Sequence, residues 1–243
     1  MKQVKVDVHT HTIMSGHAFG TLDEMCRAAA EKGIEVYGIT EHGPSIAGTC
    51  DPIYYSCYGF VPREQYGMKL LLGCEINIID DKGTLDLDQH YIDYLDIRIA
   101  GIHAKHVGRF WELNSPKYNT DAYLACIKNP EIDIISHPDA VDADFDELCA
   151  AAKEYHKFLE INAHSPLLKS HRPHAAQNIR RILECAKKYN LEVLMSSDAH
   201  YMAGIGDMSN LDPFMEETAF PEELIINYRP NDFLKYIQER RNR

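Results

Sequence analysis

Three observations predict that this 243-residue chain folds as a single α/β barrel. Short apolar runs alternate with helical patterns along the sequence, and this alternation is typical of a parallel sheet. Ionisable residues stand at the ends of successive apolar runs, where α/β barrels place their chemistry. No linker or low-complexity tract divides the chain, so we expect one domain over residues 1–243.

The expected strands are short apolar runs bounded by turn residues or by helical patterns. They fall near 4–9, 35–40, 69–79, 95–103, 132–137, 158–162 and 192–197. The run Leu224-Ile225-Ile226 is either a weak eighth strand or the tail of a connection.

Helices are expected at about 21–33, 120–129, 144–157, 173–189 and 231–237. Thr21 and Glu24 form a capping box at the start of the first helix, and Pro173 takes a favourable first-turn position in the fourth. Asn231 is the expected cap of the last helix, which closes the barrel. The segment 44–66 has no clear period and is expected to be a long loop over the barrel mouth, which in compact domains often acts as a lid or binding loop.

The first expected strand ends in His9-Thr10-His11. In an extended strand residues two apart face the same way, so both imidazoles can reach one cation. Two surface histidines on a strand edge are the alternative. The other expected strand ends decide between these interpretations.

Similar endings recur along the chain. Thr40-Glu41-His42-Gly43, Gly73-Cys74-Glu75, Gly101-Ile102-His103, Ser136-His137-Pro138 and Ser197-Asp198-Ala199-His200 each close an apolar run. Together with His17, the set of potential ligands is His9, His11, His17, His42, Glu75, His103, His137, Asp198 and His200, which is too many for one ion. A satisfied core histidine or a helix-capping acid would explain any single one, but not a recurrence at successive strand ends. The mixed nitrogen and oxygen donors suggest zinc first, with manganese or iron as alternatives.

Composition narrows the functional class. The formal net charge of −12 disfavours a nucleic-acid groove, which would show a basic stripe. No apolar run approaches the ~18 residues that span a bilayer, and the chain begins with a strand pattern rather than a signal peptide. Seven cysteines without C-x-x-C spacing suit a reducing compartment. We therefore expect a cytoplasmic protein with a small substrate, and the sequence leaves a homo-oligomer open.

These motifs together resemble the polymerase and histidinol phosphatase (PHP) family of metal-dependent phosphoesterases. The matching segments are Asp7-Val8-His9-Thr10-His11, His17, Thr40-Glu41-His42-Gly43, Gly73-Cys74-Glu75, His103, Ser136-His137-Pro138 and Ser197-Asp198-Ala199-His200. Chain length and the place of His17 most resemble its small stand-alone bacterial branch, the YcdX-type phosphatases. The resemblance runs from Lys5 to about Leu234 and implies a distorted (β/α)7 barrel, a TIM-like fold, with three divalent metal ions, often zinc.

The resemblance also implies how the ligands divide. His9, His11, Glu75 and Asp198 would hold a first ion, Glu75 as a bridge with His103 and His137 a second, and His17, His42 and His200 a third. Glu41 departs from the family, which usually has Asp at this position. Asp7 matches and is interpreted as an acid that orients a ligand.

The expected activity is hydrolysis of a small phosphomonoester by metal-activated hydroxide. Glu75 and Asp198 are its expected catalytic carboxylates. Arg172, which follows the sixth expected strand, is the candidate for binding phosphate, because guanidinium binds phosphate bidentately. An exposed basic loop is the alternative for Arg172. Asp198 and Glu41 are both open as donors of a proton to the leaving group.

Other functions compete with this one. A metal amidohydrolase also begins with His-x-His on a barrel strand but has little use for His17 or His42. An exonuclease activity is disfavoured by the acidic charge, and a non-enzymatic metal-binding protein would not need to keep all of these ligands. Histidinol phosphate is one substrate among several that the sequence allows.

Overall fold

The computed structural model describes residues 1–103 and 115–241. Seven parallel strands form a nearly closed barrel in the order β1-β2-β4-β5-β6-β7-β8. They are β1 (Val6–Asp7), β2 (Val36–His42), β4 (Met68–Asn77), β5 (Ile97–Gly101), β6 (Ile134–Ile135), β7 (Phe158–Asn162) and β8 (Val193–Ser196). The predicted α/β barrel is confirmed, and so are all seven expected strands, with ends that shift by a few residues.

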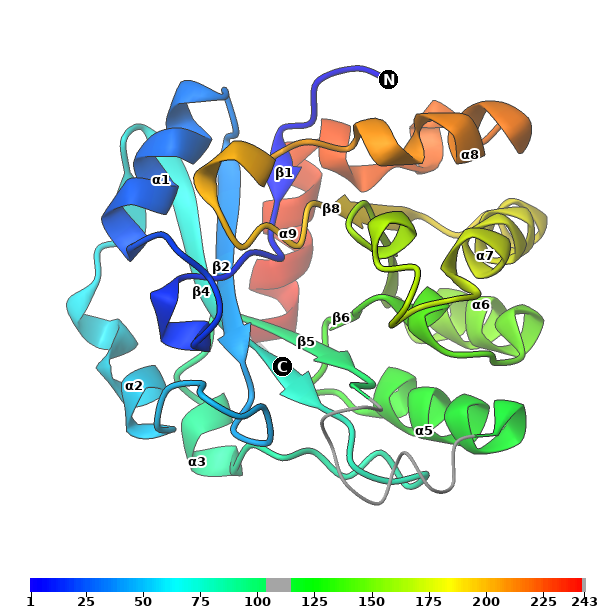
Figure 1. Cartoon of the computed structure of the whole chain (residues 1–243), viewed down its shortest axis with the longest axis horizontal. Helices are drawn as coiled ribbons and strands as arrows, with labels where there is room; N and C mark the ends of the chain where they lie inside the picture. The colour runs from blue at the N-terminus through cyan, green and yellow to red at the C-terminus, as the bar shows by residue number, and fades with distance from the viewer. Residues whose placement is uncertain (104–114, 242–243) are drawn as a thin grey trace.

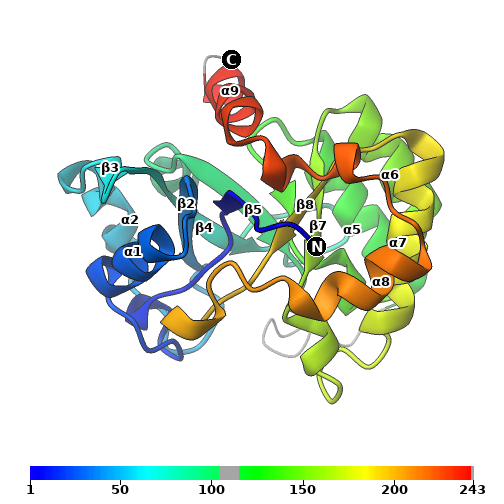
Figure 2. The same ribbon diagram turned by 90° about the horizontal axis from the view of Figure 1, so that it is seen from above.

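The helices lie around these strands in two groups (Figure 1). On one side are α1 (Leu22–Glu31), α2 (Ile53–Ser56) and α3 (Gln89–Ile92), and on the other are α5 (Pro116–Lys128), α6 (Phe145–Glu154), α7 (Ala175–Tyr189) and α8 (Asp212–Glu217). Figure 2 shows α9 (Pro230–Arg241) standing between the two groups.

Local capping explains where several of the helices begin. The Thr21 and Glu24 capping box is present as predicted. Helix α5 starts four residues earlier than expected, because Ser115 caps it and Pro116 suits the first turn. The expected cap of α9 at Asn231 is wrong, since the helix already begins at Pro230. Proline is preorganised for that first position.

Asn227 completes the barrel where β1 and β8 do not form a continuous ladder. Its side-chain Nδ2 donates to Val6 O at 2.7 Å and to Met195 O at 2.6 Å, and its Oδ1 accepts from Met195 N at 2.7 Å. The Asn227 carbonyl accepts from Lys5 N at 2.9 Å. One fully buried amide therefore takes the place of a ladder between the first and last strands. Beyond it, a single parallel bridge joins Thr10 to Ala199.

The barrel interior is a small apolar core sealed by α9. Inward-facing side chains of the strands, among them Val36, Ile97 and Phe158, pack with Phe233 and Ile237 of α9. Asp133, which precedes β6, fastens this helix through an ion pair with Arg240 at 2.7 Å. Because Asp133 and the α9 contacts lie at the amino ends of the strands, the opposite rim stays free for the ionisable residues.

The structure differs from the sequence-based prediction in two segments. Ile225 forms only an isolated bridge to Val193, so the run 224–226 is the tail of a connection and not a strand. The segment 44–66 is not one long loop, since it contains α2, a 3-10 turn (Cys57–Phe60) and the short strand β3 (Glu64–Gln65). Tyr55 and Tyr58 are buried in the outer core between sheet and helices. Burial of these aromatic rings offsets the entropy of ordering the segment.

The cysteines follow the expected pattern of free thiols. Cys26, Cys74, Cys126 and Cys149 are buried, while Cys185 is only partly covered. In the part of the chain that the structure describes, no helix is both long and apolar enough to cross a membrane.

Replacing Asn227 by alanine should lower the free energy of unfolding by about 3 kcal/mol, because buried backbone groups of Val6 and Met195 lose their partners. Urea denaturation measures the change. Asn231→Ala is the matched control, since Asn231 is exposed and its replacement should change stability by less than about 0.5 kcal/mol. Equal stability of the two variants would show that Asn227 does not close the barrel.

Candidate metal centre

The expected ligands gather at the carboxyl-terminal rim of the barrel. His9 and His11 follow β1, His42 ends β2, Glu75 lies near the end of β4, His103 and His137 follow β5 and β6, and Asp198 and His200 follow β8. His17 comes from the segment just after the 3-10 turn Ile13–Ser15. Parallel register places them together, as when His42 of β2 pairs with Glu75 of β4. The residues at the ends of these separate strands therefore form one site.

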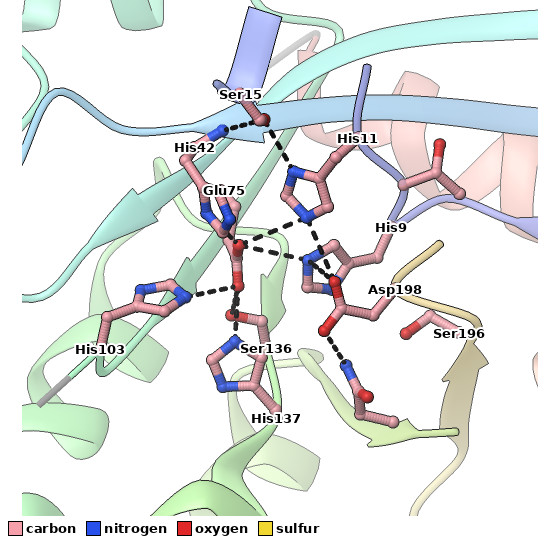
Figure 3. A network of polar contacts seen from close by, with 12 residues as sticks. His9, His11, Ser15, His42, Glu75, His103, Ser136, His137, Ser196 and Asp198 are labelled. Carbon is pink, nitrogen blue, oxygen red and sulfur yellow. Dashed lines mark hydrogen bonds and ion pairs between the residues drawn. The ribbon is translucent and has the colours of Figure 1, made fainter. Parts of the chain in front are cut away.

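Glu75 lies at the centre of the site, and Figure 3 shows histidines from four neighbouring segments directed toward it. Its Oε2 is 2.8 Å from His42 Nδ1, 3.3 Å from His9 Nε2 and 3.6 Å from His11 Nε2. Its Oε1 is 2.6 Å from His137 Nε2 and 3.3 Å from His103 Nε2. Each carboxylate oxygen thus faces a different group of imidazoles, as a bridging ligand would.

Asp198 is the second carboxylate of the site, beside Glu75. Its Oδ1 lies 3.2 Å from His11 Nε2 and 3.7 Å from His9 Nε2. Burial alone would raise the pKa of this carboxyl, but the neighbouring histidines, His9 first, hold it well below its ordinary value. The same competition keeps the pKa of Glu75 well below its ordinary value. Both acids are therefore ionised and able to bind cations.

A third group of imidazoles lies toward the opening. His42 Nε2 is 3.2 Å from His17 Nε2, and the rings of His17 and His200 have centroids 4.9 Å apart. His11 is also close, with its ring centroid 4.5 Å from that of His200. Three sets have donor atoms all within 4.8 Å of one another: His9, His11 and Asp198; His11, His42 and His200; and His42, Glu75 and His103. The sets share His11 and His42, so ligand groups overlap more than the sequence suggested.

Hydrogen bonds at the outer nitrogens fix which imidazole nitrogen faces inward. The Nδ1 of His9 donates to Glu160 Oε1 at 2.6 Å, and the Nδ1 of His11 donates to Ser15 Oγ at 3.0 Å. His200 donates its Nδ1 to the carbonyl of Asp198 at 2.9 Å. When the ring is neutral, this arrangement leaves Nε2 as the acceptor, which is the tautomer that binds metal.

The donor atoms fit divalent cations because several have no other partner. His9 Nε2, His11 Nε2, His42 Nδ1 and Glu75 Oε2 are buried and have no hydrogen-bond partner outside this cluster among the described residues. Burial lowers the pKa values of His42 and His137 to about 4, so both rings are neutral at pH 7. Neutral imidazoles with ionised carboxylates are ligands that zinc, iron and manganese accept.

The sequence analysis missed Glu160, which supports the site from behind. It is fully buried on β7, and its Oε2 accepts from His137 N at 2.6 Å while Oε1 accepts from His9. Asn162 Nδ2 donates to both Glu160 Oε2 and Asp198 Oδ2 at 3.1 Å. A charged residue inside the apolar run Phe158–Asn162 was the available signal, because a buried acid needs partners.

Two other acids differ from expectation. Glu41 is fully buried, and its carboxylate accepts from Thr12 N at 3.1 Å and from Ser15 Oγ at 2.6 Å. It therefore orders the turn that carries Ser15, and it is wrongly placed to protonate a leaving group. Asp7 accepts from Ser197 N at 3.2 Å and Gly206 N at 2.8 Å, so it anchors the residue before Asp198 and does not orient a ligand directly.

Arg172 reaches the same rim from the segment before α7. Its Nη1 donates to Ser165 Oγ at 2.6 Å, and its Nη2 is 3.8 Å from Asp198 Oδ2. The guanidinium is mostly buried, with 11% of the side chain exposed. This placement differs from the exposed basic loop that was the alternative.

A cavity of about 1000 Å³ opens above the site. Its lining includes His17, His42, His103, Asp198, His200 and Arg172. From the expected lid segment 44–66 only Ile46 and Ala47 line it, so that most of this segment is not a lid. The volume exceeds that of a phosphate group and leaves room for a second part of a bound molecule.

Comparison with known proteins gives a consistent result. The model of the PHP domain matches residues 7–164. A "probable phosphatase" of Clostridium novyi is 37% identical over 99% of this chain and 96% of its own length, and a "probable phosphatase" of Caldicellulosiruptor bescii is 36% identical over 97% and 96%. The histidinol phosphate phosphatase of Lactococcus lactis, solved with zinc, L-histidinol and phosphate, is similar in fold, with a TM-score of 0.58, 17% identity and coverage of 90% and 95%.

Glu160→Gln should weaken metal binding by about 10- to 100-fold. The amide accepts a weaker hydrogen bond from His9 Nδ1, so the tautomer of His9 with Nε2 free to bind metal is less favoured. Competition titration with a chromogenic chelator measures the affinity. Glu154→Gln, at the exposed end of α6, is the control and should bind metal as the parent protein does. Equal affinity of the two variants would exclude Glu160 as an orienting group.

Proposed function

The chain belongs to the PHP domain family, and on that premise we propose that it is a metal-dependent phosphatase acting on a small phosphomonoester. The observation that carries the proposal is the convergence of unpartnered imidazole nitrogens on the Glu75 carboxylate beneath a large cavity. The names of the relatives agree with it. Family membership favours phosphoester chemistry over the amide hydrolysis considered from the sequence.

We assign the ligands to three divalent ions. His9, His11, Glu75 and Asp198 would hold the first, Glu75, His103 and His137 the second, and His17, His42 and His200 the third. Contacts of Glu75 with five histidines support its role as a bridge. The predominance of histidine favours zinc, with manganese or iron as alternatives. The shared positions of His11 and His42 support a compact cluster rather than separate sites.

When bound, such cations lower the pKa of water toward about 7 and neutralise charge on phosphoryl oxygens. The chain's own residues position the other partners. Glu75 and Asp198 stay ionised and set the spacing of the cluster. Arg172, held by Ser165 next to Asp198, would donate hydrogen bonds to a phosphoryl oxygen at the rim. The phosphate is thereby oriented with its ester bond toward the cavity.

Histidinol phosphate stays one alternative for the substrate. The structural neighbour named for that activity shares only 17% identity, so it supports the fold and not the substrate.

Metal analysis tests the centre. Protein purified without chelator should contain more than two metal equivalents per chain, because the ligands form three sets. Chelation should abolish phosphate release from 4-nitrophenyl phosphate, and added zinc or manganese should restore it. A single tightly bound metal equivalent per chain would contradict the three-ion assignment. Turnover that resists the chelator would contradict metal dependence. Faster hydrolysis of bis(4-nitrophenyl) phosphate than of 4-nitrophenyl phosphate would contradict the preference for monoesters.

Arg172→Ala should raise KM and lower kcat/KM for phosphomonoesters by about tenfold or more, since a charge-assisted hydrogen bond contributes roughly 1.5–3 kcal/mol. Steady-state kinetics measure both constants. Arg180→Ala is the control, because Arg180 pairs with Glu217 on the outer surface of α7. Kinetics of Arg172→Ala that match the control would remove Arg172 from the phosphate site.

A further inference from the structure

One part of the cavity lining is not explained by the metal centre or by Arg172. It comes from the first turns of α5 and from the segment that follows β6, and it consists of Ser115, Pro116, Asn119, Ala140, Val141 and Asp142. None of these is among the expected metal ligands. They share one cavity with Arg172, so the leaving group of a phosphoester bound at Arg172 can lie against them.

Asn119 offers a free acceptor in this lining. Only 1% of the residue is exposed, and its Nδ2 donates to Asp142 O at 2.8 Å. A carbonyl can only accept, so this bond fixes the amide orientation and leaves Oδ1 as the other atom. Oδ1 is buried and has no hydrogen-bond partner among residues 1–103 and 115–241. A buried acceptor without a partner is destabilising, and a donor on a bound molecule would satisfy it.

The position of this free acceptor is selective. Asn77 and Asn178 also have buried side-chain oxygens without a partner in the described part of the chain, yet neither lines the cavity. Asn119 does line it, and it lies beside a second acceptor. Asp142 is exposed, and its Oδ1 accepts from Asn178 Nδ2 at 3.2 Å. No ion pair of Asp142 with a described residue is formed, so its charge is available to the cavity.

The cavity lining therefore carries two kinds of polar group. Arg172, His171 and His174 line it with groups that can donate hydrogen bonds, whereas Asn119 and Asp142 present oxygen acceptors. Ile102, Val141 and Leu168 add apolar surface to the same lining. A phosphomonoester with a donor group at the far end of its leaving group matches both chemistries.

We propose that Asn119 and Asp142 form a leaving-group subsite that selects phosphomonoesters carrying a hydrogen-bond donor, either a hydroxyl or an ammonium group. This inference rests on the proposed phosphatase function. A site that hydrogen-bonds a substrate group rejects the analogue that lacks it, because its own polar atoms are then left unpaired. Asn119 would accept a hydrogen bond from either donor, and the negative charge of Asp142 would strengthen binding of the ammonium group.

A matched series of substrates tests the subsite in the unaltered, metal-loaded protein. Monophosphates of straight-chain alcohols are compared in which the far end is methyl, hydroxyl or ammonium, over several chain lengths. At the best length the hydroxyl or ammonium ester should exceed the methyl ester in kcat/KM by about tenfold or more. Calorimetry with the corresponding non-hydrolysable phosphonates should show the same order of affinity. Equal values at every length overturn the subsite.

The same series separates failure of the subsite from failure of the proposed function. If 4-nitrophenyl phosphate and all members of the series are left intact, the phosphatase function fails. If all members are hydrolysed equally, only the subsite fails.

Two variants assign the preference to residues. Asn119→Leu removes the acceptor at similar volume and should abolish the preference for both donors, whereas Asp142→Asn should reduce the preference for ammonium alone. The measured quantity is the ratio of kcat/KM for the donor ester to kcat/KM for the methyl ester, so a change in turnover common to all esters does not alter the result. If Asn119→Leu does not fold, Asp142→Asn and the phosphonate affinities still decide, because Asp142 is exposed. Donor preferences that survive in both variants overturn the assignment.

Discussion

The buried carboxylate of Glu75 is the contact on which the functional rim depends. A fully buried acid would ordinarily raise its pKa and become neutral, yet the histidines around Glu75, His9 first, keep it ionised. In turn, histidines from β1, β2, β5 and β6 are drawn to one point because that charge is there. Removing the Glu75 carboxylate or the surrounding histidines would leave buried polar groups without partners. The cluster therefore persists as a unit.

Closure of the barrel brings the two ends of the chain into this unit. Asn227 ties Val6 of β1 to Met195 of β8, and this contact sets His9 and His11 beside Asp198 and His200. The outer hydrogen bonds then orient the rings, with Glu160 behind His9 and Ser15 behind His11. His137 and Asp198 both have left-handed backbone, with φ of 27° and 51°. Such conformations are costly for these residues and are held by the surrounding contacts.

The cavity above the cluster relates the fold to substrate choice. The wall of the cavity that carries the candidate metal ligands comes from strand ends, among them His103 and Asp198. Its other walls come from the start of α5 and from loops after β6 and β7, and these are the parts of a barrel in which specificity is usually varied. Selection of the leaving group through Asn119 is consistent with this division.

Much of the site could be predicted from the sequence because its signals are local. Strand periodicity and an ionisable residue at each strand end can be recognised from a few neighbouring residues. The sequence therefore predicted correctly that His9, His42, Glu75 and Asp198 lie close together. The capping box at Thr21 and the free cysteines were also predicted correctly. Their division among ions stays a proposal.

What only the tertiary structure decided depends on residues far apart in the chain. Asn227 bonds to Val6 across 221 positions and Glu160 to His9 across 151, and no local pattern encodes either partner. The segment 44–66 lacked a period because its tyrosines pack singly against the outer core, and Arg172 could have been exposed until Ser165 and Asp198 were brought to it. Sequence by itself fixes what each segment can form, whereas closure of the barrel determines which side chains meet, because only the packed chain excludes water from their contacts.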